Sequence, residues 1–456
     1  MPEAETRADA PAPVPPSTRP LSRSIGVGGG TLLTLSCVTP ASSLFVIVPP
    51  LLGTLGNGTA LAIALAVVLC IGCTFCYSEL GTLVPSSGGE YAMVSTVLNR
   101  FAGWMTLAIS MIVVLVVPPI IAIGVAEYLR PVLDVDPSVA GAVVMLASTL
   151  MGLLNLRANA WITGTFLLIE IGAIAVVCWL GFGHAVRPPS VLLPGALGGD
   201  YSLVTVVAGL AVALFVTQGF STSVYLAEEM REPRRTVVRT MLWTLGISSL
   251  ALLAPVVAIT LGAPDDAALA QGDLTGMVVG WSSPAVGVAI SLCIALAIIN
   301  AAIVMVIQNS RVVYASARDA TWPDPVNRAL GQVSRRFGSP WAATMVVGLS
   351  ETVLCFVPVE TLTGVTGVAV VALYLMVAVA CLRSRSSASD TRPDVWRMPW
   401  WPAVPLVVIA ALAYVLVEQS ALDLGITAAV LLAAALYWWG YLRRHPDRWS
   451  VTVPTD

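Results

Sequence analysis

The sequence has little charge. Only 11% of its 456 residues are charged, and lysine is absent, so all 23 basic residues are arginine. Soluble domains carry about 25% charged residues, whereas this chain is 57% apolar with a mean hydropathy of +0.87. The composition excludes an ordinary soluble protein and indicates an integral membrane protein. The formal net charge of −3 argues against nucleic acid as a partner.

Metal-binding and catalytic constellations are also missing. The two histidines, His184 and His445, lie alone, and most of the eight cysteines are scattered. The run CIGCTFC (70–76) sets three cysteines at helical spacing without a fourth ligand nearby, so we interpret them as small residues in a helix interface. We therefore expect no metal or other cofactor. The sequence shows no pairing of a nucleophile with a base that would indicate an enzyme.

Apolar runs recur along the chain after residues 1–25, which are rich in Pro, Ala and charge. That composition is typical of a disordered tail and not of a signal peptide. Placing the N-terminus in the cytoplasm puts every arginine except Arg130 and Arg187 on the cytoplasmic side, which supports an even number of spans and two cytoplasmic termini. Hydropathy predicts twelve spanning helices, near 28–52, 58–83, 102–127, 138–156, 160–182, 202–229, 237–262, 284–312, 341–357, 361–382, 402–418 and 422–442.

Two of these segments carry helix-breaking patterns. SCVTPASSLF (36–45) sets Pro40, which lacks an N–H, before three small residues in an uncharged run. The segment 202–229 gathers polar residues around VTQGFSTS (216–223), for which a polar packing stripe is the alternative interpretation. A broken helix inside a bilayer is tolerated where it is buried in protein or lines a cavity. Breaks at corresponding positions of two halves indicate a transporter binding site.

Three motifs resemble a known family. YSELGTLVPSSGGEYAMV (77–94), GFSTSVYLAEEMREPRRTVVRT (219–240) and SARDATWPDPVNRALGQVSRRFGSPW (316–341) are similar to segments of the amino acid–polyamine–organocation (APC) transporters, in the same order. The resemblance implies an all-α membrane protein with twelve transmembrane helices and the LeuT-type fold. Its expected parts are an N-terminal tail (1–25), two inverted five-helix repeats (26–182 and 202–382), two further helices (402–442) and a cytoplasmic tail (443–456).

The resemblance also implies a substrate site at the two breaks. An amino acid carboxylate would meet the backbone of Ser42 and Ser43, and the ammonium would meet carbonyl oxygens near Thr39, Phe215 and Gln218. Phe215 stands where the family carries an aromatic lid, with an ordinary core aromatic as the alternative. The implied binding residues are Thr39, Ala41, Ser42, Ser43, Ser110, Phe215, Gln218, Gly219 and Thr366.

Two departures from the family bear on the substrate. Many members carry Gly-Ser-Gly-Ile-Phe where this chain has ASSLF (41–45), which predicts a narrower pocket floor. Ser221 stands where the family often has an acidic residue, so a cationic substrate side chain lacks that partner.

Ion coupling is predicted from two helices. Glu170 lies near the centre of TGTFLLIEIGAIAVV (163–177), and a carboxyl at that depth costs about 2.5–3.5 kcal/mol on insertion scales. We predict that Glu170 exchanges protons, with a structural hydrogen bond to a neighbouring helix as the alternative. IALAIINAAIVMV (294–306) offers Asn300 as its one polar residue, which disfavours a sodium site. For Glu351, in the predicted ninth helix, a structural role is favoured.

Acidic residues near the predicted cytoplasmic ends suggest ion pairs. We predict that three glutamates face the arginines of REPRR (231–235): Glu79, Glu228 and Glu229. These charges are interpreted as solvated loop charge that helps to set the topology, as ion pairs of a gate on the cytoplasmic side, or as both.

Together these features predict an amino acid permease of a bacterial cell membrane. It would be a sodium-independent secondary transporter, proton-coupled or exchanging, that works by alternating access. Its partners would be a small-molecule substrate and the lipid bilayer, with monomer and homodimer both open. An amine or polyamine carrier and a transport-dead sensor of the same fold are the alternatives.

Overall fold

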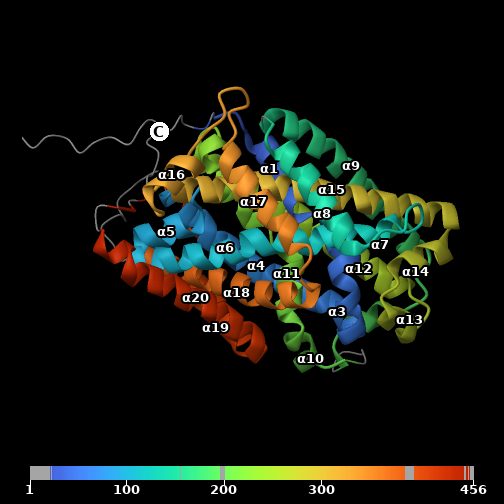
Figure 1. Ribbon diagram of the computed structural model, residues 1–456. Helices are drawn as coiled ribbons and strands as arrows, with labels where there is room; N and C mark the ends of the chain where they lie inside the picture. The colour runs from blue at the N-terminus through green and yellow to red at the C-terminus, as the bar shows by residue number, and fades with distance from the viewer. Residues whose placement is uncertain are drawn as a thin grey trace, which may run out of the picture.

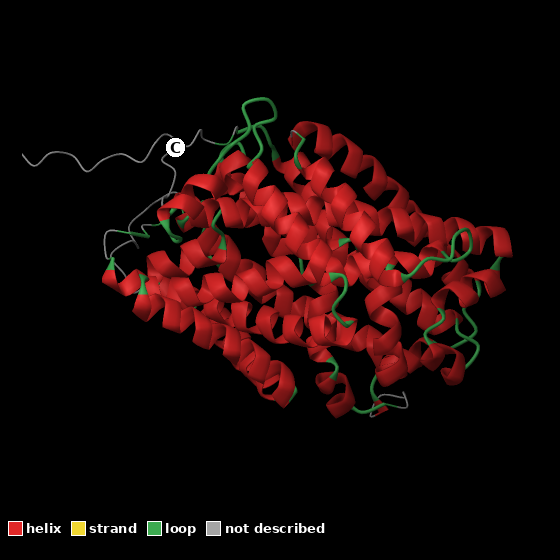
Figure 2. Ribbon diagram, viewed as in Figure 1, coloured by secondary structure: helices red, strands yellow, loops and turns green. Residues whose placement is uncertain are grey.

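The computed structural model describes residues 21–445 apart from 22, 155, 196–200 and 386–394, together with 448, 449 and 451. Most of the predicted N-terminal tail and much of the predicted tail 443–456 lie outside the described residues. Within the described part, every regular element is a helix, apart from one isolated bridge between Ile25 and Met230 (Figure 2).

Long apolar helices run roughly along one direction of the molecule, with α5 and α16 at one end and α7, α13 and α14 at the other (Figure 1). Seven helical stretches of the described chain are long and apolar enough to cross a membrane, and three shorter apolar helices accompany them. The longer helices and their neighbours are α4 (Thr59–Leu83), α5 (Glu90–Val97), α6 (Arg100–Ile123), α7 (Val125–Leu129), α8 (Pro137–Gly152), α9 (Leu156–Gly183), α12 (Pro233–Gly262), α13 (Asp266–Gln271), α14 (Leu274–Trp281), α15 (Pro284–Arg318), α16 (Asp324–Leu330), α17 (Trp341–Leu354), α18 (Val359–Ser384), α19 (Ala403–Val417) and α20 (Ala421–Gly440).

The first apolar segment is broken at Thr39, as predicted. Helix α1 (Val27–Val38) ends there because Thr39 takes the left-handed conformation, with φ 42° and ψ 72°. Pro40 then begins a new helical start, where its missing N–H costs nothing. The chain continues through α2 (Pro40–Ser42), a π-helical turn η1 (Ser43–Ile47) and α3 (Val48–Leu55).

The predicted second break is also present. After α10 (Leu203–Ala208), helix α11 (Leu210–Thr217) stops, Gln218 is extended, and Gly219 takes φ +113° before the 3₁₀ segment η5 (Phe220–Glu229). Glycine is needed here because a side chain rarely adopts this φ. A Cβ at Gly219 would also lie 3.2 Å from Val38 Cα. The two breaks are therefore in contact.

The cysteines of 70–76 lie inside the helix packing. Cys70, Cys73 and Cys76 are free and buried on α4. Cys70 Sγ lies 3.3 Å from Thr217 Oγ1, at the end of α11. This position supports the interpretation of small residues in a helix interface.

Arginines from distant helices, rather than those of 231–235, pair with the acidic residues. Glu229 Oε1 lies 2.8 Å from Arg311 Nε, and Glu228 bonds Arg318. Both arginines project from the last turns of α15, which packs against η5. Glu79 on α4 pairs in the same way with Arg385, at 2.7 Å.

The predicted pairing with the arginines of 231–235 is therefore wrong for all three glutamates. Arg235 instead lies 3.9 Å from the neighbouring Glu232, and both of these side chains are exposed. Sequence proximity misled the prediction because the η5 backbone aims Glu228 and Glu229 inward, toward α15.

The buried pair is expected to matter for stability. Glu229 and Arg311 side chains are 4% and 2% exposed, and removing one partner of such a pair costs about 3–5 kcal/mol because the other charge stays buried. Glu229→Gln should therefore lower the melting temperature in detergent by several degrees. Glu232→Gln is the matched control, since an exposed pair contributes about 0–1 kcal/mol. Equal melting temperatures for the two variants would contradict this assignment.

Candidate substrate site

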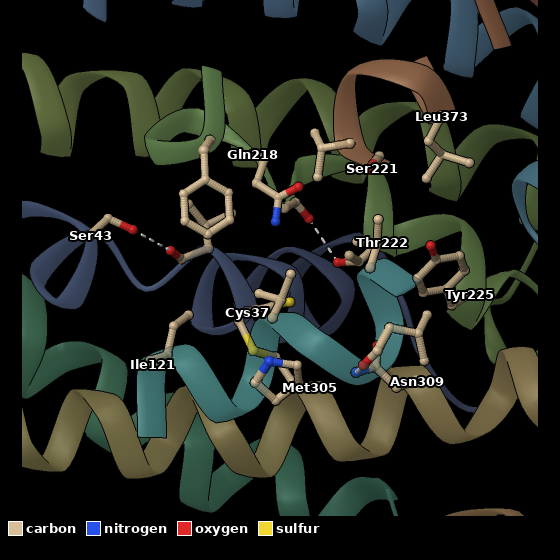
Figure 3. Close-up of a pocket in the computed structure, with 18 of the residues that line it drawn as sticks. Cys37, Ser43, Ile121, Gln218, Ser221, Thr222, Tyr225, Met305, Asn309 and Leu373 are labelled. Atoms are coloured by element: carbon tan, nitrogen blue, oxygen red, sulfur yellow. Dashed lines mark hydrogen bonds between the residues drawn. The ribbon is translucent and has the colours of Figure 1, made fainter. Parts of the chain in front are cut away.

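A small cavity of about 50 Å³ lies where the two breaks meet (Figure 3). Part of its polar lining comes from Ser43 of η1, from Gln218 between α11 and η5, and from Ser221 and Thr222 of η5. Apolar side chains of α6, α15 and α18 contribute further lining, among them Val113, Val117, Ile121, Met305 and Leu373. The arrangement places a few polar groups in an otherwise apolar chamber, which is typical of a small-ligand site.

The cavity gathers four of the nine predicted binding residues: Ser43, Phe215, Gln218 and Gly219. The other five do not line it. Ser110 and Thr366 are buried within α6 and α18, and Thr366 Oγ1 donates to Leu362 O at 2.8 Å. Thr39, Ala41 and Ser42 form the break itself, where Thr39 and Ala41 contact α9.

The hydrogen bonds at the break correct one predicted contact. Ser43 N–H donates to Thr39 O at 2.9 Å, so it is not free for a substrate carboxylate. The Ser43 hydroxyl donates to Val38 O at 3.1 Å, and the Thr222 hydroxyl donates to Gly219 O at 2.7 Å (Figure 3). Two carbonyls beside the cavity are thus satisfied by nearby hydroxyls. The Gln218 side-chain amide has no hydrogen-bond partner among the described residues and is directed toward the cavity.

Glu170 of α9 binds the start of the helix that follows the break, and it does not line the cavity. Its Oε1 accepts a 2.8 Å hydrogen bond from Ala41 N–H and lies 3.2 Å from Thr39 Oγ1. The residue is fully buried, and its Oε2 has no partner in the described chain. A carboxylate at a helix N-terminus is stabilised by free N–H groups and by the helix dipole. The Glu170 carboxyl, an ionisable group, therefore links α9 to the break by hydrogen bonds.

Phe215 separates the small cavity from a larger one. It lines both, as does Ile47, and the second cavity has a volume of about 410 Å³. That second cavity is lined by residues of η1, α3, the end of α6, α11 and the start of α18, and by Gln419. The predicted lid residue is thus placed between two spaces.

Two polar residues that sequence reasoning missed also line the small cavity. Glu90, at the start of α5, is fully buried, and its Oε1 accepts the Tyr77 hydroxyl at 3.0 Å. Asn309 of α15 lines the cavity and bonds both α6 and α17. The signal for Asn309 was the polar run QNSR (308–311) inside an otherwise apolar helix.

Comparison with known proteins decides the family. The profile described as "Amino acid permease" matches residues 28–440. The chain belongs to this family. The match confirms the resemblance to the APC transporters, and with the apolar helices it identifies a multi-pass membrane transporter rather than an enzyme.

Three relatives of this amino acid permease share low sequence identity with it. An uncharacterized transporter of Mycobacterium tuberculosis is 26% identical over 334 residues, 72% of each chain. The methylthioribose transporter of Bacillus subtilis is 23% identical over 86% of this chain and 87% of its own. A branched-chain amino acid permease of Lactococcus lactis is 23% identical over 77% of this chain and 79% of its own. The first name gives no substrate and the other two name different substrates, so these relatives do not assign a substrate to this permease.

Gly219→Ala should disturb the site without touching a polar group. The added Cβ would sit at φ +113° and press on the Val38 backbone, which adds strain of about 1–3 kcal/mol and displaces the break. We expect at least tenfold weaker ligand binding, measured by thermal shift with a panel of amino acids. Gly246→Ala is the control, because a Cβ there meets no atom within 4 Å. Equal ligand responses in both variants would show that the geometry at Gly219 is dispensable.

Proposed function

We propose that this permease is a secondary active transporter that moves amino acids across the cell membrane by alternating access. We infer twelve membrane passes arranged as two inverted five-helix repeats and two further helices, with both termini in the cytoplasm. The inference rests on the positions of the breaks, which fall in the first and sixth apolar segments. Transport would be proton-coupled or exchanging and independent of sodium.

The observation that carries the proposal is the contact between two broken helices across a partly polar cavity. The cavity offers donors and acceptors for both ends of a zwitterion. The Gln218 amide can donate to a carboxylate. A substrate ammonium could replace the hydroxyls of Ser43 and Thr222 as donor to the carbonyls of Val38 and Gly219. Charged hydrogen bonds of this kind are worth about 1.5–3 kcal/mol each.

Alternating access is supported by a difference between the two sides of the cavity, which are closed by different kinds of contact. On one side of the site, the buried pairs of Glu228 and Glu229 with α15 hold η5 in place. On the other side, two residues, Phe215 and Ile47, line both the small cavity and the larger one. We infer that the ion pairs close the cytoplasmic path and that movement of Phe215 opens the outer path. The ion pairs would break when the transporter opens toward the cytoplasm.

Proton coupling is supported by the place of Glu170. Ionised, it is a strong acceptor for Ala41 N–H and Thr39 Oγ1, whereas a neutral acid is a weaker one. Protonation would therefore loosen α9 from the break and favour movement of the first helix. Asn300, the central polar residue of α15, carries one amide oxygen, and a sodium site needs several oxygen ligands.

An amine or polyamine carrier is the second candidate. The observation that favours it is Glu90, a buried carboxyl that lines the cavity even though Ser221 replaces the usual acidic residue. A thermal-shift screen across amino acids and simple amines separates the two candidates. Stabilisation by amines lacking a carboxylate would favour this second function, and binding without flux in liposomes would indicate a sensor.

Ser43→Leu should abolish uptake. The larger side chain would fill a cavity of about 50 Å³ while remaining compatible with an apolar surrounding, so insertion and folding should persist. Ser43→Ala is the control, because alanine keeps the space and should retain most of the uptake. The measurement is uptake of labelled amino acids into proteoliposomes. Unchanged uptake by Ser43→Leu would place the substrate elsewhere.

Glu170→Gln should flatten the pH dependence of net uptake. Glutamine resembles the protonated acid and cannot release a proton, so accumulation driven by a pH gradient should be lost while substrate binding and one-for-one exchange remain. Uptake into liposomes across pH 5–8 measures this effect, with the exposed Glu360→Gln as control. If Glu170→Gln and wild type give the same pH profile, Glu170 has a structural role.

A further inference from the structure

Asn309 is held in one orientation by its neighbours. Its Nδ2 donates to Val114 O at 2.6 Å and to Glu351 Oε1 at 3.1 Å. These two bonds use both amide hydrogens. Glu351 is fully buried on α17, and its Oε2 has no partner in the described chain. The Glu351 carboxyl is therefore linked to the cavity through its hydrogen bond with Asn309.

Pro118, one of two prolines inside α6, explains why the Asn309 amide keeps its orientation. In a regular helix, Val114 O would accept the N–H of residue 118, but that residue is Pro118, which has no N–H. The freed carbonyl is buried and needs a donor, which Asn309 Nδ2 supplies. A flipped amide would set its oxygen against Val114 O. The orientation follows from hydrogen-bond chemistry.

Asn309 therefore offers its oxygen to the cavity. The side chain lines the cavity near Tyr225 and Met305 (Figure 3), and Oδ1 accepts no hydrogen bond from the described residues. The lining from α6 includes Val113 and Val114, and α18 contributes Leu373 and Tyr374. Glu90 also lines the cavity, but its Oε1 already accepts the Tyr77 hydroxyl. An acceptor held in one orientation, as Asn309 Oδ1 is, discriminates between ligands by whether they donate to it.

We propose that Asn309 is a specificity residue that selects amino acids with a hydrogen-bond donor on a short side chain, and that Glu351 is its positioning residue. This inference rests on the proposed function. The backbone ends of the substrate would meet the breaks at Ser43 and Gln218, and the side chain would extend toward Asn309. The small volume of the cavity favours a short hydroxyl side chain over a long one.

The test uses isosteric pairs: L-threonine against L-valine, and L-serine against L-2-aminobutyrate. Each is titrated into purified full-length protein by thermal shift. One neutral hydrogen bond corresponds to about a threefold to tenfold ratio of affinities in favour of the hydroxyl member. Asn309→Leu should reduce that ratio to about one. Asn300→Leu, the same change at another buried position of α15 outside the cavity lining, should leave the ratio unchanged.

Variants of Glu351 test whether this residue orients the Asn309 amide or only stabilises the fold. Glu351→Gln keeps a carbonyl oxygen for the Asn309 N–H and should preserve the ratio, whereas Glu351→Leu should lower it. Because a ratio is measured, a uniform loss of stability does not mimic the effect. Equal affinities within the wild-type pairs, or a ratio that survives Asn309→Leu, would overturn the inference while leaving the proposed function intact. Failure of every amino acid to bind wild type would overturn the proposed function and the substrate class with it.

Discussion

The hydrogen bond from Ala41 N–H to Glu170 is the interaction on which the site depends. A helix that stops inside a membrane exposes backbone donors and acceptors that lipid cannot satisfy. Here α9 supplies the acceptor for the new helix start, 2.8 Å away. The same bond fixes where Pro40 and Ser43 lie, and thereby one polar edge of the cavity. The break can persist because a distant helix compensates it.

The second break is stabilised in a different way. Gly219 adopts a conformation closed to most residues and packs on Val38, while the Thr222 hydroxyl satisfies the Gly219 carbonyl. The two breaks thus support each other through direct contact. In α6, Asn309 compensates Pro118 by the same principle, with a side chain from another helix replacing a missing N–H. Three irregular points of the backbone thus lie close to one cavity: the break at Thr39, the break at Gly219 and Pro118 of α6. A side chain of another helix bonds the backbone at the first and third points, and the nearby Thr222 hydroxyl does so at the second.

The sequence predicted the breaks because their cause is local. A proline without an N–H at position 40 and a glycine within the polar run 216–223 are visible in the chain itself. The sequence did not predict the partners of Glu228 and Glu229, because ion pairing depends on which helices pack together, and the nearest arginines in sequence point elsewhere. The link from Glu351 to the cavity was missed for the same reason, since it passes through Asn309. Ser43 N–H was expected to be free, but the turn after the break continues as helix and uses it.

Binding of an amino acid between the two breaks is tested most directly by a structure determined with an amino acid that thermal shift shows to bind. We expect ligand density bounded by Ser43, Gln218 and Phe215, with Glu170 still bonded to Ala41 and not in contact with the ligand. Density confined to the larger cavity beyond Phe215, with the small cavity unchanged, would show that the amino acid does not bind between the breaks.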